Sequence, residues 1–170
     1  PESSTPVFLH VGCGPKFKDL TPFAPQNWRE IRLDIDPGVK PDVIGTMTDM
    51  KAVLDASVDA VFSSHNIEHL YPHEVPIALA EFHRVLKPDG FVLLTCPDLQ
   101  SVCALVANDQ LTDAAYQSAV GPITPLDILY GHRGAMQAGN LYMAHRCGFT
   151  QKVLANTLAS AGFTSGVKAR

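Results

Sequence analysis

The 170 residues are enough for one substantial core and too few for two ordinary domains. No run approaches the ~20 uninterrupted apolar residues of a membrane span, and the net charge of −4 comes without a Lys/Arg block, which disfavours membrane and nucleic-acid binders. The four cysteines lack disulfide-scaffold density, and no signal-peptide pattern opens the chain. We therefore expect one cytoplasmic domain, residues 1–170, that acts on a small molecule.

Six short runs have the composition of β-strands. They lie at 7–11, 31–34, 42–45, 58–63, 91–95 and 163–167. Most of these runs are apolar throughout rather than alternating, which is typical of parallel strands buried on both faces. Because helical patterns separate several of them, the sequence predicts an α/β fold with a parallel sheet covered by helices.

Two helices complete the predicted elements. The first covers 75–86, where apolar residues recur at helical spacing, and the KPDG turn at 87–90 ends it. The second covers 151–161, with Thr150 as its cap and Gly162 as its stop. Two prolines between the first two strands leave room there only for a short, irregular helix.

Residues 101–149 break this alternation and are rich in Tyr, His, Gly and Pro. A loop of that length inside a compact domain usually carries function, so we expect this insertion to face the substrate. Its candidate acceptor-binding residues, suited to a hydroxylated or anionic molecule, are Tyr130, His132, Arg133 and Tyr142. The alternative is a loop that only covers the sheet, with its polar side chains in solvent.

The end of the first strand, Gly12-Cys13-Gly14, predicts a ligand site. A Gly-x-Gly turn lets a ligand approach the backbone, because no Cβ blocks it. Asp34 follows about 20 residues later, at the end of the second strand, where a carboxylate can accept hydrogen bonds from both ribose hydroxyls. Together these features predict a nucleoside-type cofactor at the carboxyl ends of the first strands.

The segment after Gly14 distinguishes between two such cofactors. A dinucleotide needs a third glycine and a well-formed helix N-terminus to hold its pyrophosphate. Here Pro15, Lys16 and Phe17 follow instead, and the predicted first helix is poor. S-adenosylmethionine has no phosphate and needs no such helix. The sequence therefore favours S-adenosylmethionine, with an NAD-type oxidoreductase as the alternative.

Four segments in order, GCGP at 12–15, LDIDP at 33–37, VDAVFSSHNIEHL at 58–70 and EFHRVLKPDGFVLLTCPD at 81–98, resemble the class I S-adenosylmethionine-dependent methyltransferases. The resemblance implies a doubly wound, Rossmann-like sheet of order 3-2-1-4-5-6. The family's usual seventh strand is not evident, and a homodimer could cover the resulting edge. The segment PLDILYGHRGAMQAGNLYMAHRCGFT also looks like a subgroup of small predicted methyltransferases associated with sugar or polysaccharide pathways.

The same resemblance implies where the cofactor binds. The Gly12–Gly14 turn would line the methionine and ribose, Asp34 would bind the ribose hydroxyls, and Ile35 would pack on the adenine. The full set of implied cofactor-binding residues is His10, Gly12, Cys13, Gly14, Lys16, Asp34, Ile35, Thr46, Met47, Ser64, His65 and His69.

Some positions depart from the family's pattern. His10 stands where an acid is usual, which leaves recognition of the methionine ammonium open. Lys16 could hold the methionine carboxylate or lie in solvent. After the third strand the usual acid is replaced by Thr46, with Met47 beside it and Asp49 three residues on. The sequence does not say which of these reaches the adenine amino group.

The predicted reaction moves a methyl group from S-adenosylmethionine to oxygen or nitrogen of a small acceptor, such as a sugar or polysaccharide precursor, and releases S-adenosylhomocysteine. Positioning and exclusion of water should supply most of the acceleration. A base must take the acceptor's proton, and His145 is predicted for this role. A cofactor-binding protein without turnover is a further alternative, because the superfamily has no invariant catalytic residue.

His65-x-x-Glu68-His69 matches the H-x-x-E-H pattern of one class of zinc peptidases. That pattern needs a long helix to turn both histidines toward one metal, plus a further acidic ligand. Pro72 ends the segment within about a turn. We therefore predict no metal site, and expect Glu68 and His69 to line the cofactor pocket or cap the next helix.

Overall fold

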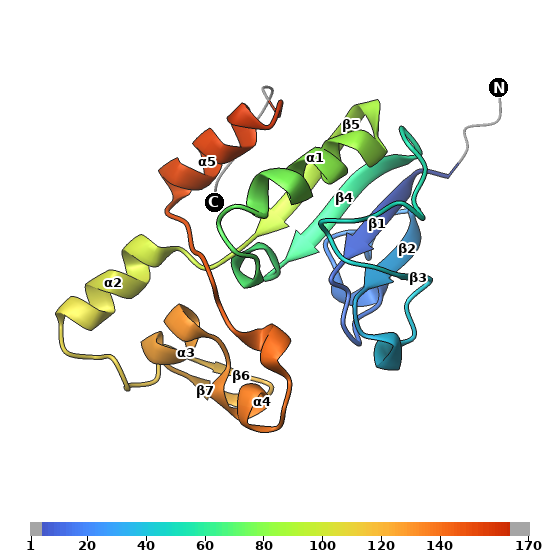
Figure 1. Cartoon of the computed structure of the whole chain (residues 1–170). Coiled ribbons are helices and arrows are strands. Elements are labelled where there is room, and N and C mark those ends of the chain that lie inside the picture. The colour runs from blue at the N-terminus through green and yellow to red at the C-terminus, as the bar shows by residue number, and fades with distance from the viewer. Residues whose placement is uncertain (1–4, 164–170) are drawn as a thin grey trace.

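Five parallel strands form the centre of the computed structural model, which describes residues 5–163. The strands are β1 (Val7–Val11), β2 (Arg29–Asp34), β3 (Val43–Ile44), β4 (Val58–Ser64) and β5 (Leu86–Thr95). Their order is β3-β2-β1-β4-β5 (Figure 1), which confirms the predicted α/β Rossmann-like class and the order of the first five strands. The sixth strand predicted at 163–167 lies outside the described residues, except for Phe163, which is not in a strand.

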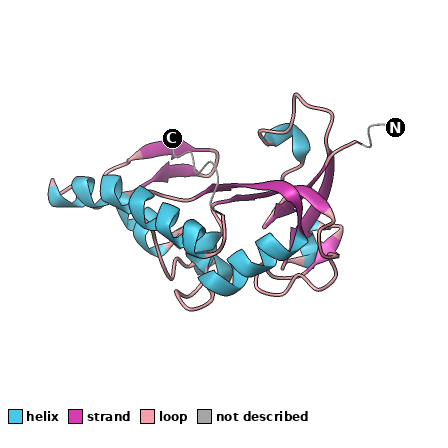
Figure 2. Cartoon of the chain, turned by 90° about the horizontal axis from the view of Figure 1, so that it is seen from above, coloured by secondary structure: helices cyan, strands magenta, loops and turns pink. Residues whose placement is uncertain are grey.

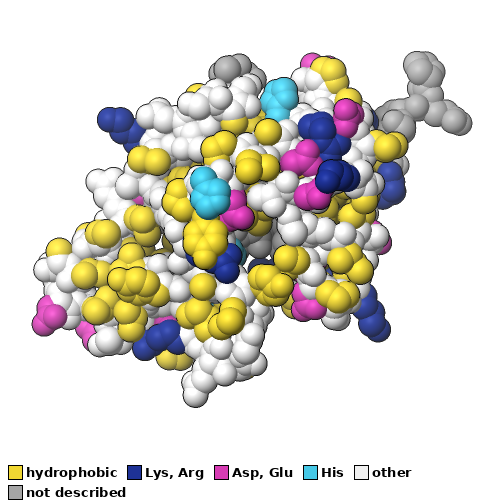
Figure 3. All heavy atoms as spheres, viewed as in Figure 1, with side chains coloured by type: hydrophobic (Ala, Val, Ile, Leu, Met, Phe, Trp, Pro, Cys, Tyr) yellow, Lys and Arg dark blue, Asp and Glu magenta, His cyan; other side chains and the backbone are white. Residues whose placement is uncertain are grey.

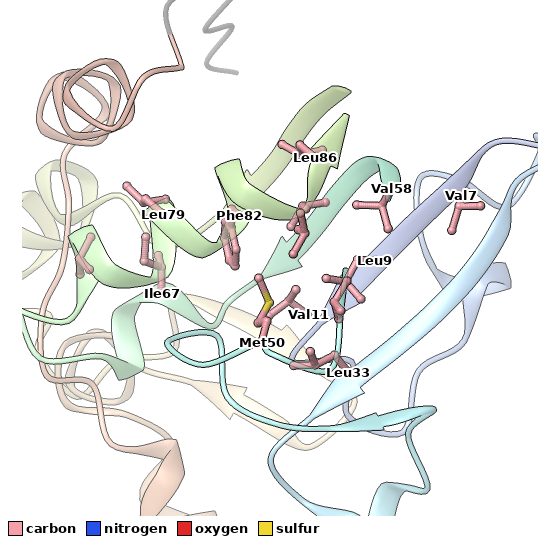
Figure 4. Close-up of a cluster of buried hydrophobic side chains, with 14 of the residues drawn as sticks. Val7, Leu9, Val11, Leu33, Met50, Val58, Ile67, Leu79, Phe82 and Leu86 are labelled. Atoms are coloured by element: carbon pink, nitrogen blue, oxygen red, sulfur yellow. The ribbon is translucent and has the colours of Figure 1, made fainter. Parts of the chain in front are cut away.

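The main core lies between the sheet and α1 (Val75–Val85). Leu9 of β1 and Phe82 of α1 are fully buried in it (Figure 4). Because successive strand residues point to opposite faces, Phe8 enters a second cluster, where its ring stacks on Phe23 at 4.2 Å between centroids. Seen from above, the longer helices lie along one side of the sheet (Figure 2).

The connection between β1 and β2 contains a single 3-10 turn, Lys18–Leu20, instead of a full helix. This agrees with the short, irregular helix that the prolines predict. Aromatic side chains of this connection cover that face of the sheet instead. The rings of Phe23 and Trp28 pack edge to face in the second cluster, with 5.0 Å between their centroids. The sheet is therefore covered by a helix on one face and mainly by loop residues on the other.

The fifth strand begins directly after α1, at Leu86, and not at residue 91 as predicted. Its pairing with β4 shifts around Asp59, so residues 87–90 bulge out of the ladder instead of forming a separate turn. Asp59 Oδ1 accepts a hydrogen bond from Lys87 Nζ at 2.7 Å, which ties the bulge to β4. The sequence KPDG was correctly placed as the end of the helix but wrongly excluded from the strand.

The insertion at 101–149 is a folded lobe and not a long loop (Figure 1), so this part of the prediction is wrong. Its elements are α2 (Leu99–Ala107), the hairpin β6 (Tyr116–Ser118) and β7 (Gly121–Ile123), α3 (Pro125–Tyr130), α4 (Arg133–Gln137) and a 3-10 turn at Leu141–Met143. Each element is short, so none produces a long periodic pattern in the sequence. We call residues 99–149 the lobe.

The last described helix, α5 (Gln151–Ser160), returns the chain from the lobe to the side of α1 (Figure 1). Leu154 and Leu158 of α5 pack against the main core, and Thr150 caps its start, which confirms the helix predicted at 151–161. Within residues 5–163 no helix is both long enough and apolar enough to cross a bilayer.

Asp127 organises the two short helices of the lobe. Its carboxylate accepts hydrogen bonds from the Thr124 backbone N–H at 3.1 Å and hydroxyl at 2.7 Å, while Thr124 Oγ1 accepts one from the Asp127 N–H. This is a capping box at the start of α3. Arg133 Nε donates to Asp127 Oδ1 at 2.7 Å. The Arg133 guanidinium, followed by the Thr124 hydrogen bonds, holds the pKa of Asp127 well below its usual range.

A carboxyl group whose pKa is lower in the folded than in the unfolded protein stabilises the fold above about pH 4, and this contribution is lost as the pH falls toward the folded pKa. Asp127→Asn should therefore lower the free energy of unfolding at neutral pH by about 1–3 kcal/mol. The difference from wild type should shrink below about pH 4. Melting curves across this pH range measure it, with Asp113→Asn, an exposed carboxylate of the same lobe, as the control. Equal melting of Asp127→Asn and wild type at neutral pH would contradict the assignment.

Candidate active site

The turn after β1 has a backbone that only glycine adopts easily. Gly12 and Gly14 have φ angles of +63° and +53°. A Cβ at Gly12 would collide with the side-chain amide of Asn66, whereas a Cβ at Gly14 would meet nothing within 4 Å. Gly12 is therefore needed for close packing inside the protein, and Gly14 opens onto space that a ligand can use.

Asp34, at the end of β2, binds this turn. Its Oδ2 accepts a hydrogen bond from the Gly14 N–H at 2.7 Å, and its Oδ1 accepts one from the Asp36 N–H at 2.9 Å. The residue is 8% exposed, and a carboxylate has about four lone-pair positions, so it retains the capacity to accept further hydrogen bonds. Ile35, which is 40% exposed, follows it. The structure thus brings the predicted ribose ligand next to the glycine turn.

Arg32 holds the same turn from the same strand, and the sequence analysis missed it. Its Nη2 donates to the Gly14 carbonyl at 2.6 Å and its Nε to the Lys16 carbonyl at 3.1 Å. Its Nη1 donates to the Lys40 carbonyl at 2.8 Å, and its guanidinium lies over the Phe17 ring. Its position between the apolar residues Ile31 and Leu33 was the available signal, because a charge that is buried in a strand needs such partners.

Asn66 is a second residue that the sequence analysis missed. Its Nδ2 donates to the carbonyl oxygens of Val11 and Ser64, each at 3.0 Å, and so joins the ends of β1 and β4. Ser64 Oγ accepts a hydrogen bond from Thr95 Oγ1 at 2.8 Å, which extends the connection to β5. His65 follows with φ +56° and a side chain that is 59% exposed. His65 thus lies just past the end of β4, as predicted, whereas Ser64 is the last residue of the strand and not past it.

Thr46 and Met47 follow β3 and are both half-buried. Thr46 pairs with Asp49 in an isolated bridge, and its Oγ1 lies 2.7 Å from Thr48 Oγ1. Asp49 is exposed and forms an ion pair with Lys51 at 3.1 Å. The three candidates for contact with the adenine therefore lie in one tight turn, and which of them makes it stays a prediction.

Three other predicted cofactor residues have different environments. His10 is 2% exposed and lies on the face of the sheet opposite α1. Its Nδ1 is 2.7 Å from Glu30 Oε1. Burial is the main cause that lowers the pKa of His10. Burial also raises the pKa of the Cys13 thiol to about 11, which keeps it protonated. Lys16 is exposed. Their contacts with a cofactor stay predictions.

His69 and His145 meet where the lobe crosses the end of β4. Their rings lie 4.9 Å apart, edge to face. The His69 Nδ1 is 3.1 Å from the Ala144 carbonyl, and the His145 Nδ1 is 2.6 Å from the Ile128 carbonyl. Burial is the main cause that lowers the pKa of His145. The lobe therefore places His145 beside His69, a predicted cofactor-site residue.

The backbone fixes this meeting point. The N–H groups of Arg146 and Cys147 both donate to the Glu68 carbonyl, at 2.8 and 3.2 Å. Arg146 Nη1 donates to the His69 carbonyl at 3.0 Å. Glu68 and His69 lie in a 3-10 turn, Ile67–His69, and not in the helix that an H-x-x-E-H zinc motif needs.

The four predicted acceptor-binding residues divide into two pairs. Arg133 is paired with Asp127, and His132 Nδ1 accepts a hydrogen bond from the Ala135 N–H at 3.1 Å, as the cap of α4. Tyr130 and Tyr142 are 63% and 60% exposed. Hydrophobic side chains are frequent on the visible face of the lobe (Figure 3). The tyrosines, rather than Arg133 and His132, are thus the members with side chains free for a ligand.

Residues 9–94, just over half of the chain, match the family described as "Methyltransferase domain". The chain belongs to this methyltransferase family. The matched segment contains the glycine turn, Asp34, Asn66 and the Ile67–His69 turn. No curated protein matches the sequence.

Solved structures of methyltransferases share the fold. A SAM-dependent methyltransferase from Archaeoglobus fulgidus aligns with a TM-score of 0.62 at 17% identity, over 94% of this chain and 61% of that one. One from Mesorhizobium loti aligns with a TM-score of 0.57 at 16% identity, over 95% and 76%. The 1,6-didemethyltoxoflavin-N1-methyltransferase of Burkholderia thailandensis, with 1,6-didemethyltoxoflavin and S-adenosylhomocysteine bound, aligns with a TM-score of 0.53 at 20% identity, over 92% of this chain and 60% of that one. The chain thus spans about three fifths of two of these structures.

The two glycines of the methyltransferase turn predict different mutant effects. Gly12→Ala should destabilise the fold more than Gly14→Ala, because both incur the strain of a positive φ, about 1–3 kcal/mol, but only the first collides with Asn66. In an Asn66→Ala background, Gly12→Ala should lower the free energy of unfolding by an amount closer to that of Gly14→Ala. Denaturant unfolding of the two single variants and the double variant measures this coupling. Equal destabilisation at both positions, unchanged by Asn66→Ala, would contradict the packing.

Proposed function

We propose that this chain transfers a methyl group from S-adenosylmethionine to an oxygen or nitrogen atom of a small acceptor and releases S-adenosylhomocysteine. The observation that carries the proposal is the glycine turn held by Asp34 at the carboxyl ends of β1 and β2, within the segment that matches the methyltransferase family. Family membership favours this reaction over the NAD-type oxidoreductase. The Burkholderia enzyme, with a small acceptor and S-adenosylhomocysteine bound, supports the choice of substrate class.

The residues at the site suit this cofactor. Asp34 keeps lone pairs for the ribose hydroxyls, and the space at Gly14 admits a ligand against the backbone. Ile35 offers an exposed apolar side chain to the adenine. When bound, the cofactor supplies an electrophilic methyl group on a sulfonium sulfur, and we place that end near Ser64 and His65. The protein's task is then to position the acceptor and to exclude water.

We place the acceptor between the end of β4 and the lobe, where His145 lies beside His69. Tyr130 and Tyr142 offer exposed rings and hydroxyls on the lobe, which suit a hydroxylated ring such as a sugar. A carbonyl oxygen can only accept a hydrogen bond, so the His145 Nδ1 that faces Ile128 carries the hydrogen. Its Nε2 then has the free lone pair that a base needs.

Asp34→Ala should weaken binding of S-adenosylhomocysteine by about 1.5–3 kcal/mol, because the hydrogen bonds from the ribose to a charged group are lost. Calorimetry on the folded variant measures the change, and NAD should not bind either protein. Asp36→Ala, which removes an exposed carboxylate bonded to the Gly38 N–H, is the matched control. If the folded Asp34→Ala variant keeps wild-type affinity, Asp34 is not the ribose ligand.

His145→Ala should leave affinity for S-adenosylhomocysteine nearly unchanged and reduce turnover by roughly 10²- to 10⁴-fold, as expected for loss of a general base. The assay follows methylation of a panel of sugars and phenols, with His132→Ala as a control histidine from the same lobe. Full activity of His145→Ala would remove this residue from the reaction. Cofactor binding without methylation of any acceptor would instead favour a protein that binds the cofactor without turnover.

A further inference from the structure

Three potential ligands for a metal come together beneath the lobe. A carboxylate oxygen of Glu68 and one ring nitrogen each of His69 and His145 lie within 4.8 Å of one another. Glu68 and His69 are neighbours in the Ile67–His69 turn, whereas His145 comes from the far end of the lobe. The hydrogen bonds from the Arg146 and Cys147 N–H groups to the Glu68 carbonyl hold the two segments against each other.

The Glu68 side chain is an independent sign of a missing partner. It is 2% exposed, and in the described part of the chain neither of its carboxylate oxygens has a hydrogen-bond partner. The nearest basic group recorded for it is His65, whose Nδ1 lies 3.5 Å from Oε1. A buried carboxylate without donors is strongly disfavoured unless a cation or proton compensates it. Buried polar atoms without a hydrogen-bond partner are rare in native folds, so the two carboxylate oxygens of Glu68 require an explanation.

The two histidines are oriented as metal ligands commonly are. The Nδ1 atoms of His69 and His145 face the carbonyl oxygens of Ala144 and Ile128, which can only accept hydrogen bonds. Each Nδ1 therefore carries a hydrogen in the neutral ring, and each Nε2 has its lone pair free. A backbone carbonyl that fixes the tautomer and direction of a ligating imidazole is the usual support of a metal-bound histidine.

We propose that Glu68, His69 and His145 bind one divalent cation of the zinc type. Two histidines and one carboxylate form the ligand set of zinc sites that keep a position open for water or substrate. With metal–ligand distances of about 2.0–2.2 Å, ligand atoms in a tetrahedral site lie about 3.4 Å apart. Side-chain rotations that bring these atoms, now within 4.8 Å of one another, closer by up to about 1.4 Å therefore complete the site. The proposal replaces the expectation of no metal, which considered His65 with His69 on a helix and did not include His145.

The consequence for acceptor chemistry rests on the proposed function, whereas cation binding does not. An acceptor hydroxyl on the open position would have a lowered pKa and would release its proton to solvent water. Its oxygen would then form the bond to the methyl carbon while the sulfur–methyl bond breaks and leaves its electron pair on sulfur. His145 Nε2 cannot bind a cation and a proton together, so the cation would replace it as the group that activates the acceptor. The site thus favours oxygen acceptors over nitrogen acceptors.

Calorimetric titration of zinc chloride into the full chain, first stripped of metals with a chelator, tests the site. Wild type should bind one zinc ion per chain. Glu68→Gln, which keeps the shape of the side chain, and His145→Gln should each lose about 100-fold or more in affinity, and cobalt(II) should give a visible absorption band that both variants lack. His73→Ala, an exposed histidine stacked on Tyr71, is the control and should bind zinc as wild type does.

Binding of S-adenosylhomocysteine to the same preparations shows that each variant is folded, and it separates this proposal from the proposed function. No zinc binding by wild type, or equal zinc affinity in Glu68→Gln and His145→Gln, would overturn the metal site. Zinc binding that His73→Ala abolishes would assign the ion to the surface and would also overturn it. Zinc binding without any binding of S-adenosylhomocysteine would support the site and contradict the proposed function instead.

Discussion

The candidate active site depends on how β2 holds the backbone of a single residue, Gly14, from both sides. Asp34 accepts a hydrogen bond from the Gly14 N–H, and Arg32 donates one to the Gly14 carbonyl. Arg32 and Asp34 are two residues apart on one strand, so both side chains leave the sheet on the same face. The turn after β1 contains no regular helix that could fix its conformation. These hydrogen bonds from β2 replace that support, and the carboxylate that would contact the ribose also shapes the turn beside it.

The second half of the site depends on the lobe, which specific hydrogen bonds join to the turn after β4. The Glu68 carbonyl accepts hydrogen bonds from two successive N–H groups of the returning chain, and the Ile128 carbonyl orients His145. Internal order of the lobe comes from the Thr124–Asp127 capping box and the Arg133 ion pair. Because His145 and Ile128 are 17 residues apart in the lobe, the orientation of this imidazole requires the chain between them to be folded.

The sequence was sufficient to predict those features that a local pattern encodes. Apolar runs and their spacing predicted the parallel sheet, and the family resemblance implied its strand order. Gly12, Gly14 and Asp34 predicted the end of the sheet that carries the site. The lobe was taken for a loop because its elements are too short for a periodic pattern, although Thr124, Pro125 and Asp127 together form a recognisable helix start. No local pattern could predict the contact between His69 and His145, because these residues are 76 positions apart in the sequence. The contact also depends on the Ile128 carbonyl, which orients His145 from a third segment.

His145 Nε2 is proposed both as a general base and as a metal ligand, and the environment of Glu68 distinguishes between these two roles. The hydrogen bond from Nδ1 to the Ile128 carbonyl serves a base and a metal ligand equally well, because both need the lone pair on Nε2. A base, however, gives no reason for a neighbouring carboxylate that is buried and without hydrogen-bond donors. The histidine recorded nearest to that carboxylate is His65, with Nδ1 3.5 Å from Glu68 Oε1, but its side chain is 59% exposed, and a solvent-exposed partner compensates a buried charge only weakly. A divalent cation compensates Glu68 and uses both histidines in their neutral form, and it therefore accounts for more of the observed geometry than a base alone.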